Sequence, residues 1–335
     1  PMTDKTNSKL ILITGATGKG GTAFIERLLE EDRYSSYRIR ALCHNRLLEE
    51  TDRLEVVKGT ISDREVAAAA VSGVSHILHL ATCKETPEDI MDVTVKGLFW
   101  ILEEARVSEA FQQLILLGGD AGMGHFFYPH ALPVTEEQGH SAYPGCYALS
   151  KVLEEVLVEQ YCIQYDLNAC CLRAPWIMEK DDFRYTLTFS REVFGGPRWC
   201  DLVEPEEAAD YERAGTIPVL CNPEGEPIYR NFVHVNDLVN AILLSIGNPA
   251  ATQETFNICM DEPVHYRKVA DYLGKTRNLD SVDISTEFHS TWLDNSKARF
   301  LLGWAPDYTL ERLIDEAWDY QRAEDAPRKI WYPGS

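Results

Sequence analysis

The 335-residue chain lacks an excess of positive charge, a long apolar run and an ordered cysteine pattern. Its 53 Asp and Glu residues outnumber its 32 Lys and Arg residues, and the resulting net charge of −21 gives a surface that repels phosphate backbones and anionic lipid. No stretch reaches the roughly 20 apolar residues of a membrane-spanning helix. Residues 1–8 lack the apolar segment of a signal peptide. We therefore expect neither nucleic acid nor a membrane as a partner.

The nine cysteines include no CxxC pair and have no spacing typical of a disulfide framework or a zinc site. This pattern predicts free thiols in a reducing compartment, the cytoplasm, and no metal centre. Low-complexity tracts and internal repeats are also missing, which argues against disordered and solenoid proteins. With 45% apolar residues and a length of about two domains, the chain can form a full core.

Short apolar runs alternate with longer amphipathic ones over the first half of the chain. The apolar runs predict six strands, at Lys9–Ile13, Arg38–Cys43, Leu54–Lys58, His76–Leu80, Gln113–Leu117 and Ala169–Arg173. Between them, helical patterns cover Thr22–Glu31, an alanine-rich stretch capped by Asp63, Ile90–Ser108 and Tyr147–Tyr165. This alternation is typical of an α/β fold whose doubly wound parallel sheet carries helices on both faces.

After Pro175 this alternation stops. Residues 179–227 are rich in Pro, Gly, Asp and Glu and have weak periodicity. The later patterns predict a helix at Val235–Ile246, a strand at Phe256–Ile258, and helices near Tyr266–Leu273 and Leu310–Tyr320. We expect a dinucleotide-binding domain at 9–175 and a smaller, interleaved α/β lobe at 176–335 that binds substrate, with 235–260 returning to the first domain.

A glycine-rich turn directly follows the first strand and opens the first helix, with the sequence Gly15-Ala16-Thr17-Gly18-Lys19-Gly20-Gly21. Glycines at this spacing permit a tight turn, a close approach of the backbone to a pyrophosphate, and close packing of helix on strand. The helix N-terminus then offers N–H groups to the phosphates. We expect Gly15, Thr17, Gly18 and the 19–21 segment to bind a dinucleotide; the alternative is a flexible surface loop.

The choice of dinucleotide depends on the end of the second strand. An acidic residue there binds the adenosine ribose of NAD, whereas basic residues favour the additional phosphate of NADP. The strand is followed by His44, Asn45 and Arg46, and no Asp or Glu occurs until Glu49. These residues, with the positive charge of Lys19, favour NADP over NAD. The alternative is that Arg46 is only a solvated loop charge.

Tyr147 and Lys151 lie four residues apart, which places a phenol and an ammonium one helical turn from each other. The ammonium favours the phenolate, so the phenol is able to take and return a proton. Apolar Val152, Val156 and Tyr161 predict that this helix packs against the sheet. By itself the pair is more often a solvated helix pair, but it becomes specific beside a dinucleotide turn.

Together these features resemble the extended short-chain dehydrogenase/reductases, of the NAD-dependent epimerase/dehydratase type that modifies sugars and nucleotide sugars. The resemblance covers nearly the whole chain. It rests on six segments in the family's order: Thr14–Gly21 (TGxxGxxG), Lys58–Asp63 (the third-strand region), His79–Thr82 (HLAA), Tyr147–Lys151 (YxxxK), Arg230–Asp237 (RDFVHVDD) and Leu302–Pro306 (LGWxP).

The resemblance implies a Rossmann lobe that holds NAD(P) and a smaller lobe that closes over a sugar or nucleotide sugar. It makes Tyr147 the acid/base at a substrate hydroxyl and Lys151 the group that holds the nicotinamide ribose. The cofactor would be lined by Leu80, Ala81, Thr82 and Pro175. Arg230 would grip a substrate diphosphate, with a structural ion pair as the alternative. A homodimer that pairs through the Tyr147 helix and its neighbour is also implied.

The sequence departs from the family at several positions. Gly119 stands where a Ser or Thr usually hydrogen-bonds the reacting oxygen, and the loss of such a donor commonly costs about 2.7–4 kcal/mol. Asp120 is the candidate substitute, with a turn or capping residue as the alternative. Ala121 replaces the glutamate base of the sugar 4,6-dehydratases, so 4,6-dehydration is a less favoured hypothesis for this chain.

Other differences affect the cofactor and the loop before Tyr147. Thr60 stands where an aspartate usually meets the adenine, so adenine contact is expected from Thr60, Ile61 or Asp63. Thr94 replaces an asparagine that supports the active-site backbone. Among the loop histidines, His125 is a candidate substrate contact or proton-transfer group.

Two hypotheses follow. The first is an NAD(P)-dependent epimerase, or a dehydrogenase or reductase, that acts on a sugar or nucleotide sugar; an epimerase retains its cofactor, whereas a dehydrogenase exchanges it. The second is a dinucleotide-binding sensor that has lost catalysis, because Gly119 lacks the hydroxyl. Intact Tyr147 and Lys151 argue against the sensor.

Overall fold

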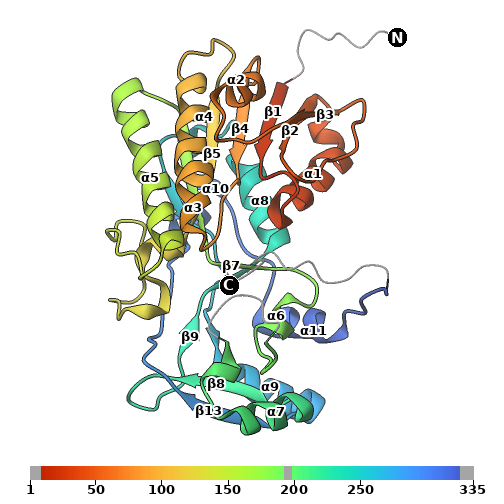
Figure 1. Cartoon of the computed structure of the whole chain (residues 1–335), viewed down its shortest axis with the longest axis vertical. Coiled ribbons are helices and arrows are strands. Elements are labelled where there is room, and N and C mark those ends of the chain that lie inside the picture. Colours follow the sequence, from red (N-terminus) through yellow and green to blue (C-terminus); the bar gives the residue numbers. More distant parts are fainter. Residues whose placement is uncertain (1–8, 192–197, 325–335) are drawn as a thin grey trace.

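The larger of two lobes is built on a seven-stranded parallel sheet with the order β11-β6-β5-β4-β1-β2-β3 (Figure 1). The computed structural model describes residues 9–191 and 198–324. Its sheet strands are β1 (Lys9–Thr14), β2 (Tyr37–Cys43), β3 (Leu54–Lys58), β4 (His76–His79), β5 (Gln113–Gly119), β6 (Ala169–Ala174) and β11 (Thr255–Asn257). The predicted doubly wound α/β fold is confirmed, and the six predicted strands of the first half match within two residues at their ends.

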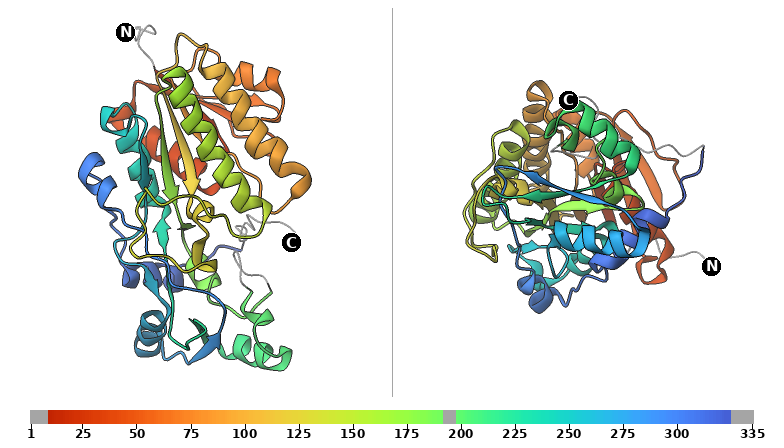
Figure 2. Two further views of the ribbon diagram at one scale, coloured as in Figure 1. Left: turned by 90° about the vertical axis from the view of Figure 1, so that its left-hand side faces the viewer. Right: turned by 90° about the horizontal axis from the view of Figure 1, so that it is seen from below.

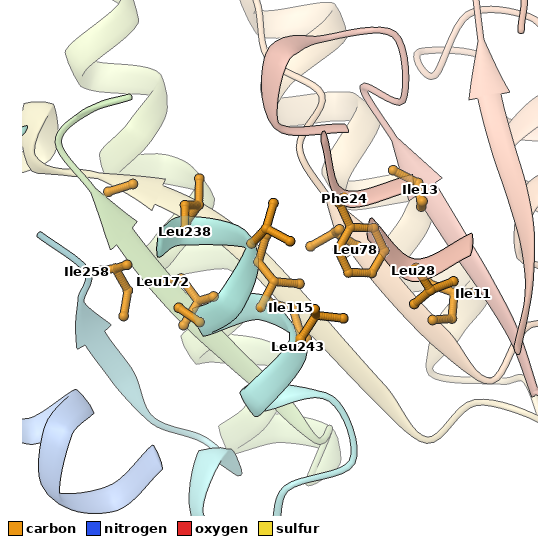
Figure 3. Close-up of a cluster of buried hydrophobic side chains, with 14 of the residues drawn as sticks. Ile11, Ile13, Phe24, Leu28, Leu78, Ile115, Leu172, Leu238, Leu243 and Ile258 are labelled. Atoms are coloured by element: carbon orange, nitrogen blue, oxygen red, sulfur yellow. The ribbon is translucent and has the colours of Figure 1, made fainter. Parts of the chain in front are cut away.

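Helices cover both faces of this sheet because successive side chains of each strand point to opposite sides. In β1, Ile11 and Ile13 join a core with α1 (Lys19–Glu30) and α8 (Val235–Ser245). Leu12, between them, joins the opposite core with α2 (Arg64–Val71), α4 (Gly97–Ala105) and α5 (Cys146–Tyr165). Figure 3 shows the first of these cores, where Leu238 and Leu243 of α8 lie beside Ile115 and Leu172 of the sheet.

The smaller lobe has a separate apolar core, which includes Trp199, Phe232 and Tyr266. Its strands form two-stranded pairs: β7 (Trp176–Met178) with β10 (Phe232–His234), β8 (Ile217–Cys221) with β13 (Ser281–Ser285), and β9 (Tyr229–Arg230) with β12 (Val264–His265). Its helices are α6 (Asp182–Tyr185), α7 (Pro205–Ala214), α9 (Tyr266–Arg277) and α11 (Leu310–Asp319). The two lobes interleave, because α8, β11 and α10 (Ser296–Leu302) pack into the core of the larger lobe.

The structure corrects two sequence expectations about helices and strands. The weakly periodic stretch 179–227 contains α6, α7 and β8, which the sequence pattern did not show. α7 buries only Ala208, so it lacks the apolar face by which a helix is recognised. β8 is an apolar run, but it contains Pro218, a residue that sheet interiors disfavour. The predicted single helix at 90–108 is α3 (Pro87–Ile90), a π-helical turn (Met91–Lys96) and α4.

Two histidines of β4 are buried in the sheet. The hydroxyl of Thr14 accepts the N–H groups of Leu80 (3.1 Å) and Ala81 (3.2 Å) and lies 3.0 Å from Nδ1 of His79. Because its acceptor positions are filled, the hydroxyl donates to Nδ1, and the neutral ring carries its proton on Nε2. Burial lowers the pKa of His79 to about 3 and that of His76 to about 4.

These buried imidazoles predict a loss of stability in mild acid. In the unfolded chain a histidine titrates near pH 6.5, so between about pH 6.5 and 4 the unfolded state binds protons that the folded state does not. Stability therefore falls as the pH falls, by about 2 kcal/mol at pH 5 for His79 alone. We expect His79→Asn to show a smaller drop in unfolding free energy between pH 7.5 and 5 than the wild type, measured by urea denaturation. The exposed His44→Asn variant is the control, and equal pH dependence in all three proteins would contradict the prediction.

Candidate functional site

A pocket of about 750 Å³ lies at the carboxyl ends of the strands, where the strand order reverses between β1 and β4. With the exception of Asp63, the residues that the sequence predicted for cofactor, substrate or catalysis line this pocket: Gly15, Thr17, Gly18, Lys19, Gly20, Gly21, His44, Asn45, Arg46, Thr60, Ile61, Leu80, Ala81, Thr82, Asp120, His125, Tyr147, Lys151, Pro175 and Arg230. The structure therefore brings together segments from both lobes into one cavity.

The glycine turn forms the floor of the pocket because side chains do not fit there. Gly15 has φ +68°, and a Cβ on it would lie 2.8 Å from the backbone of Leu80 and Ala81. A Cβ on Gly21 would lie 2.5 Å from the carbonyl oxygen of Gly15. The turn thus presses against the end of β4, and the N-terminus of α1 opens into the pocket.

The end of the pocket beside β2 carries His44, Asn45 and Arg46, with Thr60 and Ile61 after β3. The pocket contains no carboxylate from the segment that directly follows β2. Asp63, an alternative adenine contact in the sequence analysis, does not line the pocket and caps α2 through the N–H of Glu65.

Lys19 reaches from the glycine turn to the smaller lobe. Its ammonium donates to the carbonyl oxygen of Ile177 at 2.8 Å and forms a buried ion pair with Asp182 of α6. The carboxylate neutralises this ammonium, so Lys19 adds no net positive charge to the pocket.

Glu85, a pocket residue that the sequence analysis missed, fixes the start of α5. Its carboxylate accepts the N–H groups of Cys146 (3.0 Å) and Tyr147 (3.3 Å), which are otherwise unpaired at a helix N-terminus. Gly145 precedes them with φ +148°, and a Cβ there would lie 2.6 Å from Oε1 of Glu85. The cap places Tyr147 in the first turn of the helix, facing the pocket.

Lys151 lies one turn further along, fully buried at the end of β5. Its Nζ donates to the carbonyl oxygen of Leu117 at 3.2 Å and lies 2.8 Å from the Glu154 carboxylate. Burial by itself lowers the pKa of Lys151, but the Glu154 carboxylate outweighs burial and raises that pKa above its ordinary value. Lys151 therefore stays positively charged at neutral pH, one helical turn after Tyr147.

A second lysine, Lys84, also faces the phenol and was not found from the sequence. Its Nζ lies 4.1 Å from the centre of the Tyr147 ring, whereas Nζ of Lys151 lies 5.9 Å from it. Burial lowers the pKa of Lys84, and the neighbouring Tyr147 partly offsets that effect. Tyr147 is thus flanked by two ammonium groups.

The buried face of α5 differs from the apolar face that the sequence predicted. Tyr161 is buried, but Val152 and Val156 are only partly so, and the sheet side carries Lys151, Glu154 and Glu155. Glu155 pairs with Arg173 and His140, each at about 2.8–2.9 Å. Charged groups occupy this face because each has a partner of opposite sign.

At the end of β5 the structure pairs two of the predicted residues. Nδ1 of His125 lies 2.9 Å from Oδ2 of Asp120, and both side chains are almost fully buried. Gly119 lines the pocket beside them. Thr94, at the position of the family's asparagine, accepts the N–H of Cys83 at 2.8 Å and so supports the backbone after β4.

Arg230 is buried between aromatic rings, with its guanidinium carbon 3.8 Å from the centre of Phe126 and 4.3 Å from that of Trp176. Among the described residues it forms no ion pair with a carboxylate, which argues against the structural ion pair considered from the sequence. Together with Phe127, Tyr143 and Phe288, these two rings form an aromatic wall of the pocket. The aromatic wall could not be recognised from the sequence because its rings come from four distant segments and share no motif.

Within residues 9–191 and 198–324, no helix combines the length and the apolar character that a bilayer crossing demands. No group of three His, Cys, Asp or Glu side chains in the same ranges is arranged to hold a metal ion.

The residues present fit a dinucleotide. The turn that excludes side chains leaves room for a pyrophosphate against the backbone, and the N-terminus of α1 supplies N–H donors to it. His44, Asn45 and Arg46 follow β2 on one side of the strand-order reversal, and Lys151 packs at the end of β5 on the other, so the pocket spans both sides of the glycine turn.

Comparisons with known proteins identify the family of the chain. The profile of the NAD dependent epimerase/dehydratase family matches residues 11–178. A UDP-glucose 4-epimerase of Mycolicibacterium smegmatis is 26% identical, with 93% of this chain and 98% of the relative covered. A short-chain dehydrogenase/reductase superfamily protein of Agrobacterium tumefaciens with bound NAD superposes with a TM-score of 0.75 at 23% identity, covering 92% of this chain and 95% of the other.

The UDP-glucose 4-epimerase of Thermotoga maritima, solved with UDP-glucose, superposes with a TM-score of 0.71 at 20% identity and covers 93% of this chain and 98% of its own. Structural likeness at these identities shows the fold, and the family profile spans half of the chain. The chain belongs to the NAD dependent epimerase/dehydratase family.

Proposed function

We propose that the protein is an NAD(P)-dependent oxidoreductase or epimerase, of the extended short-chain dehydrogenase/reductase type, that acts on a sugar or nucleotide sugar. The observation that carries this proposal is the placement of Tyr147 and Lys151 in the same pocket as the glycine turn. The family of the chain supports it, and so does the activity named for its relative from Mycolicibacterium smegmatis.

Tyr147 is the acid/base of the proposed reaction. A bound NAD(P) supplies the acceptor and donor of hydride. Tyr147 takes the proton of a substrate hydroxyl as that carbon is oxidised and returns it on reduction. Lys84 and Lys151 stabilise its phenolate by Coulomb attraction, and Lys151 also holds the nicotinamide ribose.

Arg230 holds an anionic part of the substrate in this proposal. A guanidinium that is 3% exposed and lacks a carboxylate partner among the described residues is costly unless an anion meets it. The diphosphate of a nucleotide sugar supplies such an anion, and the aromatic wall fixes the guanidinium to receive it.

We propose NADP rather than NAD as the preferred cofactor, because His44 and Arg46 line the adenosine end and no carboxylate follows β2 there. Arg46→Ala is expected to weaken NADP⁺ binding about tenfold or more, the value of one charge-assisted hydrogen bond, and to leave NAD⁺ binding unchanged. Isothermal titration with both nucleotides measures this. Arg64→Ala, outside the pocket, is the control; tighter binding of NAD⁺ by the wild type, or an equal loss of both nucleotides, would contradict the preference.

Tyr147→Phe is expected to lower turnover at least a hundredfold, the lower bound for a removed general acid/base, while binding of NAD⁺ or NADP⁺ stays intact. A screen of UDP-glucose, UDP-glucuronate, free hexoses and uronates, read by nicotinamide absorbance and by product chromatography, provides the substrate. Retention of nucleotide through purification favours an epimerase, and ready exchange favours a dehydrogenase or reductase. A Tyr147→Phe variant with unchanged conversion would favour the alternative, a dinucleotide-binding sensor, which Gly119 supports.

We also propose a homodimer that pairs through α4 and α5. The two helices lie side by side on one outer face of the larger lobe (Figure 2), and α5 exposes Leu149 and Ile163. Burial of such apolar side chains drives association. Sedimentation velocity is expected to show twice the chain mass of 37.9 kDa, and Ile163→Glu is expected to shift the protein toward monomer. A monomer at micromolar concentration would refute the dimer.

A further inference from the structure

Packing does not prevent a side chain with a hydroxyl at position 119, where this sequence has glycine. At Gly118, its neighbour, a Cβ would lie 2.6 Å from Sγ of Cys171, so a side chain there would force neighbouring side chains to shift. At Gly119 the nearest atoms to an added Cβ are the Ala174 oxygen at 3.6 Å and the Ala121 nitrogen at 4.0 Å, which are ordinary contacts. The backbone of Gly119 is extended, with φ −157°, and any residue adopts that conformation. A serine therefore fits at this position.

Another polar group stands immediately beside this space. Asp120 and His125 both line the pocket, with only 6% and 12% of their side chains exposed. Nδ1 of His125 is the ring nitrogen beside Asp120, 2.9 Å from an Oδ2 that accepts no hydrogen bond from the described residues, so Nε2 is the other polar atom of the ring. When His125 is protonated, the pair carries no net charge, so a buried site tolerates it.

The imidazole is held in place by an unusual backbone. Gly124 has φ +90° and His125 follows with φ +52°, a left-handed conformation that is uncommon for residues other than glycine. His130 contacts the carbonyl oxygen of His125 through Nε2 at 2.7 Å, and the His125 ring lies 5.7 Å from that of Tyr143. Backbone strain of this kind persists where the surrounding structure fixes a functional side chain.

The turn that carries this pair packs directly on the helix that carries Tyr147. A Cβ on Gly122 would lie 3.4 Å from the Val152 side chain and 3.6 Å from its backbone nitrogen. Lys151 also donates to the carbonyl oxygen of Leu117, three residues before Asp120. The turn and α5 therefore lie together on the same side of the pocket.

We propose that His125 replaces the missing hydroxyl and hydrogen-bonds the reacting oxygen of the substrate through Nε2, with Asp120 as its positioning residue. This inference rests on the proposed function. Nε2 accepts a hydrogen bond from the substrate alcohol when the ring is neutral, and donates one to the ketone when the ring is protonated. The proton of the alcohol still passes to Tyr147, so His125 stabilises the changing charge on oxygen without a further covalent step.

The decisive experiment restores the hydroxyl. His125→Gly removes the imidazole without backbone strain, because glycine adopts positive φ freely. We expect it to lower kcat about a hundredfold with little change in NAD⁺ or NADP⁺ affinity. Gly119→Ser added to this variant is expected to recover at least tenfold of the lost kcat. Both are assayed with the substrate that the wild type converts in the sugar screen, and thermal unfolding of each variant measures folding.

Controls and adverse outcomes separate this inference from the proposed function. His265→Ala, at a stacked histidine of β12 outside the pocket, is expected to match the wild type. If His125→Gly keeps the wild-type kcat, or if Gly119→Ser does not recover the lost kcat, His125 does not have the proposed role. In either case a slow Tyr147→Phe variant still supports the proposed function. Absence of wild-type turnover, or full activity of Tyr147→Phe, refutes the proposed function and this inference with it.

Asp120→Asn tests the positioning role. An amide keeps the size of the side chain but loses the charge that compensates a protonated ring, so we expect kcat to fall while KM and nucleotide affinity stay close to wild type. The same Gly119→Ser change is expected to make activity independent of residue 120. Equal losses of kcat with and without Gly119→Ser would assign Asp120 a structural role and overturn the proposed pairing.

Discussion

The close contact between the first βα turn and the end of β4 is the constraint on which the rest of the site depends. Gly15 lies so near the backbone of Leu80 and Ala81 that no side chain fits between them. The Thr14 hydroxyl at the end of β1 accepts hydrogen bonds from both of those N–H groups, so the ends of β1 and β4 are held together. Because the strand order reverses at this junction, the chain is forced to leave a pocket above it.

The second requirement of the site is that buried charge be balanced where α5 meets the sheet. Lys151 faces the sheet because Glu154 neutralises it, and Glu155 does so because it meets Arg173 and His140. Helix α5 is thus held by ion pairs as well as by apolar contacts. Removing one partner of such a pair leaves an uncompensated buried charge, which costs more than the pair contributes.

The sequence predicted those parts of the structure whose signal is local. A continuous apolar strand, a glycine turn and a Tyr-x-x-x-Lys spacing are each readable within a few residues, so the sheet and the pocket residues they carry were recognisable. α7 was missed because it has almost no buried face, and β8 because it is a short run with a proline whose partner, β13, is far away in the chain. Lys84 and Glu85 were missed because only the fold brings them to Tyr147. The buried face of α5 was predicted wrongly because a hydrophobic pattern gives no signal for charged residues that are buried as ion pairs.

The Lys19–Asp182 ion pair joins the glycine turn of one lobe to α6 of the other. Both side chains are almost fully buried, so water and salt screen their attraction little. The pair therefore resists any movement that separates the glycine turn from α6. The position of the smaller lobe is tied by charge to the residue that directly follows Gly18.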